Sequence, residues 1–232
     1  MNFTVIHPTN KSDGVRGRLS SALVITGFVP MQCGHSVRYE GLNERMYLES
    51  LDFNPTVKSV WPQPLSFKFA DQPGKYKYTP DFLVEFSPQN GEQPLSPMLV
   101  EVKAKQELMA EKNNLLPGFR AATEYCREQG WRFRIVTDCY LKRPYAKNIR
   151  FLSHYLRNAY DQNIATRLKL TLRQLGVIPI AQLLEASFAD AEDRLLALGV
   201  TWHLIATRNF GISLLTPIST DSLIWEAHHG KA

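Results

Sequence analysis

Two short acidic motifs, each next to a run of apolar residues, constrain the fold of this chain most strongly. Pro80-Asp81 opens one apolar run, and Glu101-Val102-Lys103 closes the next. Short runs rich in β-branched and aromatic residues, bounded by turn residues, predict strands. Residues two apart on a strand share a face, so Glu101 and Lys103 point the same way and a neighbouring strand can bring Asp81 beside them. The sequence therefore predicts a sheet that carries two carboxylates and an ammonium group together.

The pattern around these motifs predicts an α/β domain with a mixed sheet flanked by helices. We expect a first helix over 42–53 with Asn43 as its N-cap, and a second over 119–129 with Pro117 in its first turn and Gly130 at its end. The expected strands cover residues 57–61, 65–69, 81–86, 98–102 and 132–137.

The expected domain organisation follows from changes in composition and in predicted secondary structure along the chain. Residues 1–141 are expected to form an N-terminal arm and the α/β domain, and residues 142–163 a basic helical bridge. Residues 164–232 are expected to form a small winged-helix-like domain of three short helices and a β-hairpin. The three helices are expected over 164–175, 179–186 and 190–198, the last ending at Gly199, and the hairpin strands over 210–215 and 222–225.

Charge is distributed unevenly along the 232 residues, whose net charge is +5. Residues 165–232 hold six basic and six acidic side chains, so the whole excess lies before them. A winged helix that reads DNA alone usually concentrates lysine and arginine, so the neutral tail is predicted to work largely through protein contacts. The expected phosphate contacts lie earlier in the chain, at Lys75, Lys77, Lys105, Lys142, Arg143, Lys147 and Arg150.

Several classes of protein are excluded by what the sequence lacks. Three scattered cysteines do not make a disulfide scaffold and fit a reducing cytoplasm. No run of ~18 apolar residues predicts a membrane span, and no signal peptide is visible at the N-terminus. No Ser-His-Asp pattern, phosphate-binding glycine loop or dinucleotide fingerprint is found. Cys33-Gly34-His35 lacks the second pair of ligands that a zinc site requires.

The predicted cluster has the composition of a metal-dependent phosphodiesterase. The carboxylates of Asp81 and Glu101 and the backbone carbonyl of Val102 are hard oxygen ligands, which suit Mg²⁺ or Mn²⁺. The ammonium group of Lys103 is placed to orient or help deprotonate an attacking water and to counter the charge of a phosphate. The alternative is a proline turn and an unrelated solvent-facing ion pair.

These motifs resemble a known family. The Pro-Asp…Glu-x-Lys pattern is typical of the restriction-endonuclease-like nuclease fold, and residues 35–140 resemble the nuclease domain of TnsA, the endonuclease subunit of heteromeric cut-and-paste transposases. The similar stretches are residues 39–44, 51–57, 63–64, 78–82 and 100–103, together with Cys126-Arg127 and residues 136–138.

The resemblance implies a function and a site. It implies that Glu44, on the helix before the strands, joins Asp81 and Glu101 as a metal ligand, with Lys103 beside the water. It further implies a Mg²⁺-dependent enzyme that cleaves the 5′ ends of a transposon in the bacterial cytoplasm, on DNA of the nucleoid. The implied partners are a DDE-type transposase subunit (TnsB-like) and an ATPase regulator (TnsC-like). Two alternatives stay open: a stand-alone restriction- or resolvase-like nuclease, and a catalytically silent DNA-bound assembly subunit.

Overall fold

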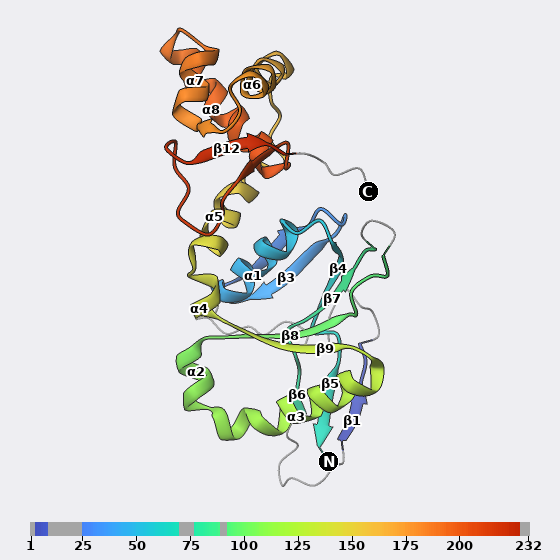
Figure 1. The fold of residues 1–232 in the computed structure, drawn as a ribbon. Helices are drawn as coiled ribbons and strands as arrows, with labels where there is room; N and C mark the ends of the chain where they lie inside the picture. Colours follow the sequence, from blue (N-terminus) through green and yellow to red (C-terminus); the bar gives the residue numbers. More distant parts are fainter. Residues whose placement is uncertain (1–2, 9–24, 70–76, 89–91, 228–232) are drawn as a thin grey trace. The chain divides into compact units, whose positions relative to one another are not determined.

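The computed structural model describes residues 3–8, 25–69, 77–88 and 92–227 and divides the chain into two compact units (Figure 1). The N-terminal unit is Met1–Leu141 and the C-terminal unit is Lys142–Ala232. Lys75, one of the expected phosphate contacts, lies outside the described residues. In the described ranges, none of the helices combines the length and the apolar character needed to cross a membrane.

A mixed four-stranded sheet forms the centre of the N-terminal unit, in the order β4-β7-β8-β9. The first three strands pair antiparallel, whereas β8 and β9 run parallel. This mixed α/β architecture confirms the predicted fold class. The strands are β4 (Val57–Pro62), β7 (Phe82–Phe86), β8 (Met98–Lys103) and β9 (Arg132–Thr137).

Two smaller sheets hold the other strands that the structure describes in this unit. One has the order β1-β5-β6, and the other is the hairpin β2-β3, so the predicted strand over 65–69 does not belong to the central sheet. The elements are β1 (Phe3–Ile6), β2 (Thr26–Pro30), β3 (Ser36–Glu40), β5 (Ser66–Phe69) and β6 (Lys77–Tyr78).

The helices of the N-terminal unit are α1 (Leu42–Asp52), α2 (Lys105–Ala110), α3 (Lys112–Gln129) and α4 (Asp138–Leu141). Two predicted boundaries were wrong. The N-cap of α1 is Gly41 rather than Asn43, because the chain turns directly from β3 into α1 through a φ of 139° that side chains other than glycine rarely adopt. Pro117 lies inside α3, since the helix begins earlier and buries Leu115 in the added turn.

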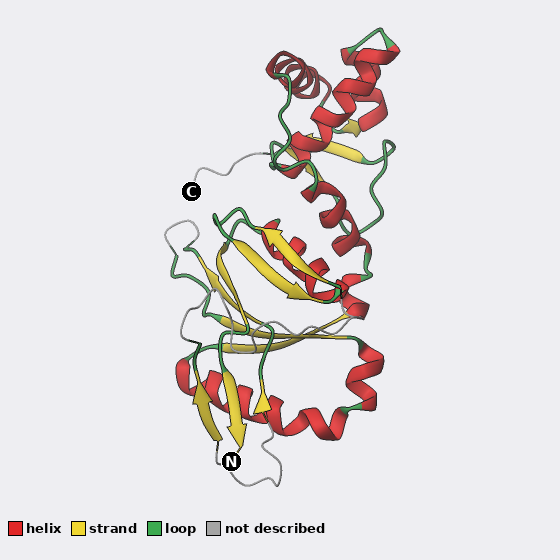
Figure 2. Ribbon diagram, turned by 180° about the vertical axis from the view of Figure 1, so that it is seen from behind, coloured by secondary structure: helices red, strands yellow, loops and turns green. Residues whose placement is uncertain are grey.

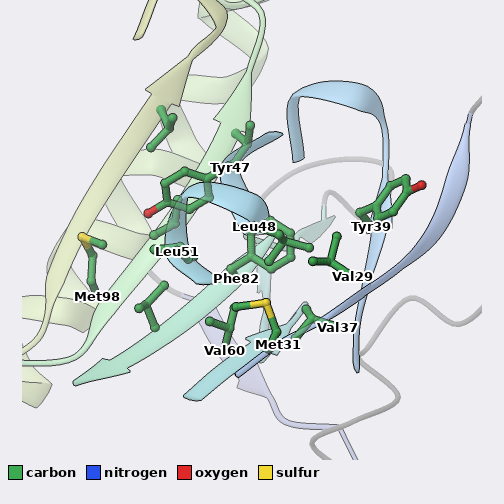
Figure 3. Close-up of a cluster of buried hydrophobic side chains, with 14 of the residues drawn as sticks. Val29, Met31, Val37, Tyr39, Tyr47, Leu48, Leu51, Val60, Phe82 and Met98 are labelled. Carbon is green, nitrogen blue, oxygen red and sulfur yellow. The ribbon is translucent and has the colours of Figure 1, made fainter. Parts of the chain in front are cut away.

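Two hydrophobic clusters lie on opposite faces of the central sheet, with α1 and the β2-β3 hairpin over one face and α3 over the other (Figures 1 and 2). Side chains of β8 alternate between the clusters: Val100 and Val102 belong to the cluster with α1, and Leu99 to the cluster with α3. Figure 3 shows the first cluster, in which Leu48 and Leu51 of α1 lie near Phe82. By the same alternation, the side chain of Glu101 lies on the face of the sheet that α3 covers.

The C-terminal unit contains α5 (Pro144–Ser153), α6 (Gln162–Leu175), α7 (Ile180–Ser187) and α8 (Ala191–Ala206), with a small antiparallel sheet in the order β10-β12-β11. Its strands are β10 (Ile178–Pro179), β11 (Phe210–Ile212) and β12 (Leu223–Glu226). The three predicted helices and the hairpin are present. Their assignment as a winged helix stays a prediction.

Two details of this unit differ from expectation. Helix α8 runs through Gly199 to Ala206, because residues 200–206 are all buried and their burial outweighs the ~1 kcal/mol that an interior glycine costs a helix. Helix α5 packs within this unit rather than standing as a separate bridge. The amide of Asn148 donates to the backbone oxygens of Leu214 and Thr216, at 3.0 and 2.6 Å, and accepts from the N–H of Ile218.

Candidate active site

Asp81 is fixed against β8 through both its backbone and its carboxylate. It lies immediately before β7, where its N–H donates to the backbone oxygen of Val100 at 2.9 Å. Its Oδ2 accepts a hydrogen bond of 2.7 Å from the N–H of Val102. The Asp81 carbonyl accepts from the N–H of Gln63, a residue of the loop after β4. The carboxylate therefore has a defined position beside the end of β8.

Glu101 lies on β8 and is almost fully buried, with 5% of its surface exposed. By the alternation along β8 it shares the face of Leu99, which packs with α3 and β5. Its Oε2 accepts a hydrogen bond of 2.9 Å from the hydroxyl of Tyr78, and its Oε1 lies 3.8 Å from the Nζ of Lys103. Both carboxylate oxygens thus have polar neighbours, as a buried charge requires.

Tyr78, which the sequence analysis did not select, is held tightly by its surroundings. Its ring is stacked on Phe67, with centroids 6.1 Å apart, and meets Phe119 edge to face at 5.7 Å. Gly118 of α3 approaches the ring so closely that an added Cβ would lie 2.4 Å from the Tyr78 Cγ. The position of α3 therefore fixes the ring of Tyr78, and the hydroxyl of Tyr78 in turn holds the carboxylate of Glu101. Its sequence signal, an aromatic residue in an alternating run, does not separate it from an ordinary core residue.

Lys103 ends β8 with its ammonium group among three carboxylates. Its Nζ lies 3.0 Å from the Oε1 of Glu107 on α2. Burial alone lowers the pKa of Lys103, but the hydrogen bond to Glu107 and the negative charges of Glu101, Glu107 and Asp81 raise it above its ordinary value. Lys103 is therefore protonated at neutral pH. Glu107 was not predicted, because Lys103 ends a strand and Glu107 lies on the following helix, and no sequence periodicity relates two such positions.

Glu44 is not brought into this cluster. Its Oε2 accepts a hydrogen bond of 2.8 Å from the N–H of Glu40, which closes the turn that leads into α1. Helix α1 packs on the sheet face of Val100 and Val102, opposite to the face of Glu101. Across the described ranges, no three His, Cys, Asp or Glu side chains are grouped in a way that would hold a metal ion. The structure thus joins Asp81, Glu101 and Lys103, and leaves Glu44 elsewhere.

The residues predicted to contact phosphate are mostly exposed. In the N-terminal unit, Lys77 is the strand partner of Lys68 on β5, and Lys105 begins α2, where its N–H donates to Asp138 at 2.8 Å. The C-terminal unit holds the remaining four positions at the start of α5 and along it. Lys142, Arg143 and Lys147 are exposed there, and Arg150 is half-buried.

The chemistry of the cluster fits a hard divalent cation. Two carboxylates are the number that Mg²⁺ commonly takes from a protein, since water and substrate phosphate fill its other positions. The neutral donors on Asp81 and Glu101, a backbone N–H and a tyrosine hydroxyl, hold the two side chains without neutralising their charge. The pair is thus suited to Mg²⁺ or Mn²⁺, with a cationic neighbour in Lys103.

A comparison with models of protein families gives a match that contains this cluster. No curated protein matches the chain. Residues 54–138 match the family model described as "TnsA-like endonuclease N terminal". The matched segment begins just before β4 and ends just after β9, so it contains the whole central sheet and the Asp81, Glu101 and Lys103 cluster. By this match, residues 54–138 of the chain are similar to the N-terminal domain of TnsA-like endonucleases.

Proposed function

We propose that this chain is a Mg²⁺-dependent DNA endonuclease, the subunit of a heteromeric cut-and-paste transposase that cleaves the 5′ ends of the transposon. One observation carries the proposal. Asp81, Glu101 and Lys103 come together at the end of β8, inside the segment that matches the TnsA-like endonuclease family. Two acids that can hold a divalent cation, with an ammonium group beside them, are residue types that suit metal-dependent phosphodiester hydrolysis.

Each residue of the cluster has a distinct task in the proposed reaction. Asp81 and Glu101 would hold Mg²⁺, or Mn²⁺ in its place, together with the backbone carbonyl of Val102. A bound ion of this kind supplies Lewis-acid stabilisation of a phosphate and makes a water molecule more acidic. Tyr78 orients Glu101. The assignment of Glu44 as a third ligand stays a prediction from the family resemblance.

Lys103 acts in this scheme as a fixed positive charge. Because its carboxylate neighbours raise its pKa, it donates hydrogen bonds at neutral pH and is not the base that removes a proton from water. An ammonium group beside a phosphate stabilises the negative charge that grows in the transition state. The carboxylate of Glu107 would exchange its place beside Lys103 for the scissile phosphate when DNA binds.

The proposed partners follow from the same family. A TnsB-like DDE transposase subunit would cut and join the 3′ ends, and a TnsC-like ATPase would regulate assembly on DNA in the cytoplasm. The basic side chains of α5 would contact the phosphate backbone of the transposon ends, and the neutral remainder of the C-terminal unit would contact proteins. Such a division agrees with the exposure of Lys142 and Lys147.

Metal removal tests the proposal directly. With the partner transposase and a transposon-end substrate, we expect 5′-strand cleavage in Mg²⁺ or Mn²⁺, and none after chelation with EDTA. Strand-specific product analysis on denaturing gels separates 5′ from 3′ cuts. Sequence-specific cutting by the isolated protein would instead identify a stand-alone nuclease. Unchanged 5′-strand cleavage in EDTA would refute the metal-dependent mechanism. If the 5′ strand is not cleaved with any divalent metal, the chain is a catalytically silent subunit.

The charges of Lys103 and Glu107 are expected to contribute unequally to the rate of 5′-strand cleavage. Lys103→Met should reduce 5′ cleavage by about 100-fold, because the lost ammonium charge is one preorganised electrostatic contact to the transition state. Glu107→Gln should change cleavage by less than about threefold, since the partly exposed Glu107 contributes only a weak ion pair. Single-turnover cleavage rates at saturating DNA measure both. Equal losses in the two variants would contradict the assigned roles.

A further inference from the structure

A cysteine and a histidine form a hydrogen-bonded pair in the loop of the β2-β3 hairpin. The Sγ of Cys33 lies 3.6 Å from the Nδ1 of His35. The other ring nitrogen, Nε2, lies 3.0 Å from the backbone oxygen of Val60. A carbonyl only accepts hydrogen bonds, so this network assigns the proton of the neutral ring to Nε2 and leaves Nδ1 as the acceptor for the thiol.

The surrounding structure holds both side chains in place. The loop is closed by hydrogen bonds from the N–H of Met31 to the oxygen of His35, 3.0 Å, and from the N–H of Gly34 to the oxygen of Met31, 3.1 Å. Gly34 has a φ of 93°, which favours glycine. The imidazole is stacked on Trp61 with its centroid 4.9 Å away and the planes inclined by 12°. The thiol and its base are therefore preorganised.

Cys33 also lines a cavity of about 300 Å³. The cavity lies between the hairpin loop, the end of α1 and the start of β4, where Asp52, Asn54 and Lys58 contribute to its wall. Cys33 itself is half-buried and packs against the hydrophobic cluster under α1. A small molecule that enters the cavity would therefore contact a residue that carries a thiol.

We propose that Cys33 is an activated nucleophilic thiol that captures small soft electrophiles in this cavity. A nucleophile within hydrogen-bond reach of a base, with the base oriented by a third group, is the arrangement that activates thiols in general. With an alkyl halide, the sulfur forms a bond to carbon, the carbon–halogen bond breaks, and the thiol proton moves to Nδ1 of His35 and then to water. The site is separate from the proposed nuclease cluster and requires no metal.

The three cysteines of the chain provide an internal test. Cys139 is exposed, whereas Cys126 is buried and its burial raises its pKa to about 11. The full-length protein is treated with limiting iodoacetamide, and mass spectrometry of the peptides gives a labelling rate for each cysteine. Despite its lower exposure, Cys33 should react about tenfold faster than Cys139. A Cys33 rate equal to or below that of Cys139 would overturn the proposal.

His35→Phe provides the matched variant, since phenylalanine can keep the stacking on Trp61 but offers no acceptor to the thiol. In this variant Cys33 should become slower than Cys139, while the Cys139 rate stays unchanged. Continued protection of Cys126 shows that the fold is intact. If Cys126 becomes labelled, the variant is unfolded, and the proposal is then judged only by the labelling rates of Cys33 and Cys139 in the wild type. A fast Cys33 in a folded His35→Phe protein would rule out activation by His35.

Discussion

Replacing Asp81 by asparagine is expected to reduce 5′-end cleavage by about 1,000-fold or more while the fold is retained. Asparagine has nearly the same volume and keeps an oxygen to accept the hydrogen bond from the N–H of Val102. It removes the negative charge that the proposed divalent cation requires. Loss of ~4 kcal/mol of transition-state stabilisation corresponds to this factor.

The measurement is 5′-strand cleavage with the partner transposase present, scored beside 3′-strand cleavage in the same reaction. Glu128→Gln, an acid-to-amide change at an exposed position near the end of α3, is the control and should cleave normally. A thermal transition equal to that of the wild type shows that Asp81→Asn folds. If the folded Asp81→Asn protein cuts the 5′ strand at the wild-type rate, the proposed site is wrong.

Gly118→Ala is expected to destabilise the N-terminal unit by about 2–4 kcal/mol and to lower cleavage at the same time. The new Cβ would lie 2.4 Å from the Cγ of Tyr78. Tyr78 is 4% exposed and confined by Phe67 and Phe119, so either the ring or α3 must move. Displacement of the ring breaks the hydrogen bond to Glu101 and leaves a buried carboxylate oxygen short of a donor.

Gly199→Ala in α8 is the matched control, because it makes the same substitution inside a helix without a clash. Outside the backbone of α8 and the two adjacent residues, no heavy atom of the described residues lies within 4 Å of the position that its Cβ would take, so the helix should gain up to ~1 kcal/mol of stability. Hydrogen exchange of amides in α3 and α8 under increasing urea reads the free energy of unfolding of each unit separately. A neutral Gly118→Ala would show that α3 does not constrain Tyr78.

The sequence predicted the features that depend on local pattern. Alternating and apolar runs located the strands of the central sheet, and Gly130 was correctly expected to end a helix, where it adopts a left-handed φ of 67°. The pairing of Asp81 with the end of β8 was predictable because strand neighbours along the chain usually pair in space. Strand periodicity and the pairing of neighbouring strands were therefore enough to predict that Asp81, Glu101 and Lys103 lie close together.

The features that the sequence did not predict depend on tertiary packing. Tyr78 touches Glu101 only because β6 lies in a different sheet and α3 presses on the ring, and no local pattern carries that information. Which face of the sheet α1 covers is also decided by the assembled core, and α1 covers the face of Val100 and Val102 rather than that of Leu99. Gly199 was misjudged as a helix end because the burial of the following turn overrides its propensity.

The parallel pairing of β8 with β9 has a consequence for how the two units cooperate. Lys103 is the register partner of Thr137, and the chain leaves β9 through α4, which ends at Leu141, the last residue of the N-terminal unit. Whatever the C-terminal unit binds is therefore joined covalently, within a few residues of chain, to the strand that pairs with the Lys103 end of β8. Short tethers of this kind raise the effective local concentration to the millimolar range. Weak affinity for the donor DNA would then suffice for cutting once a partner has recruited the chain.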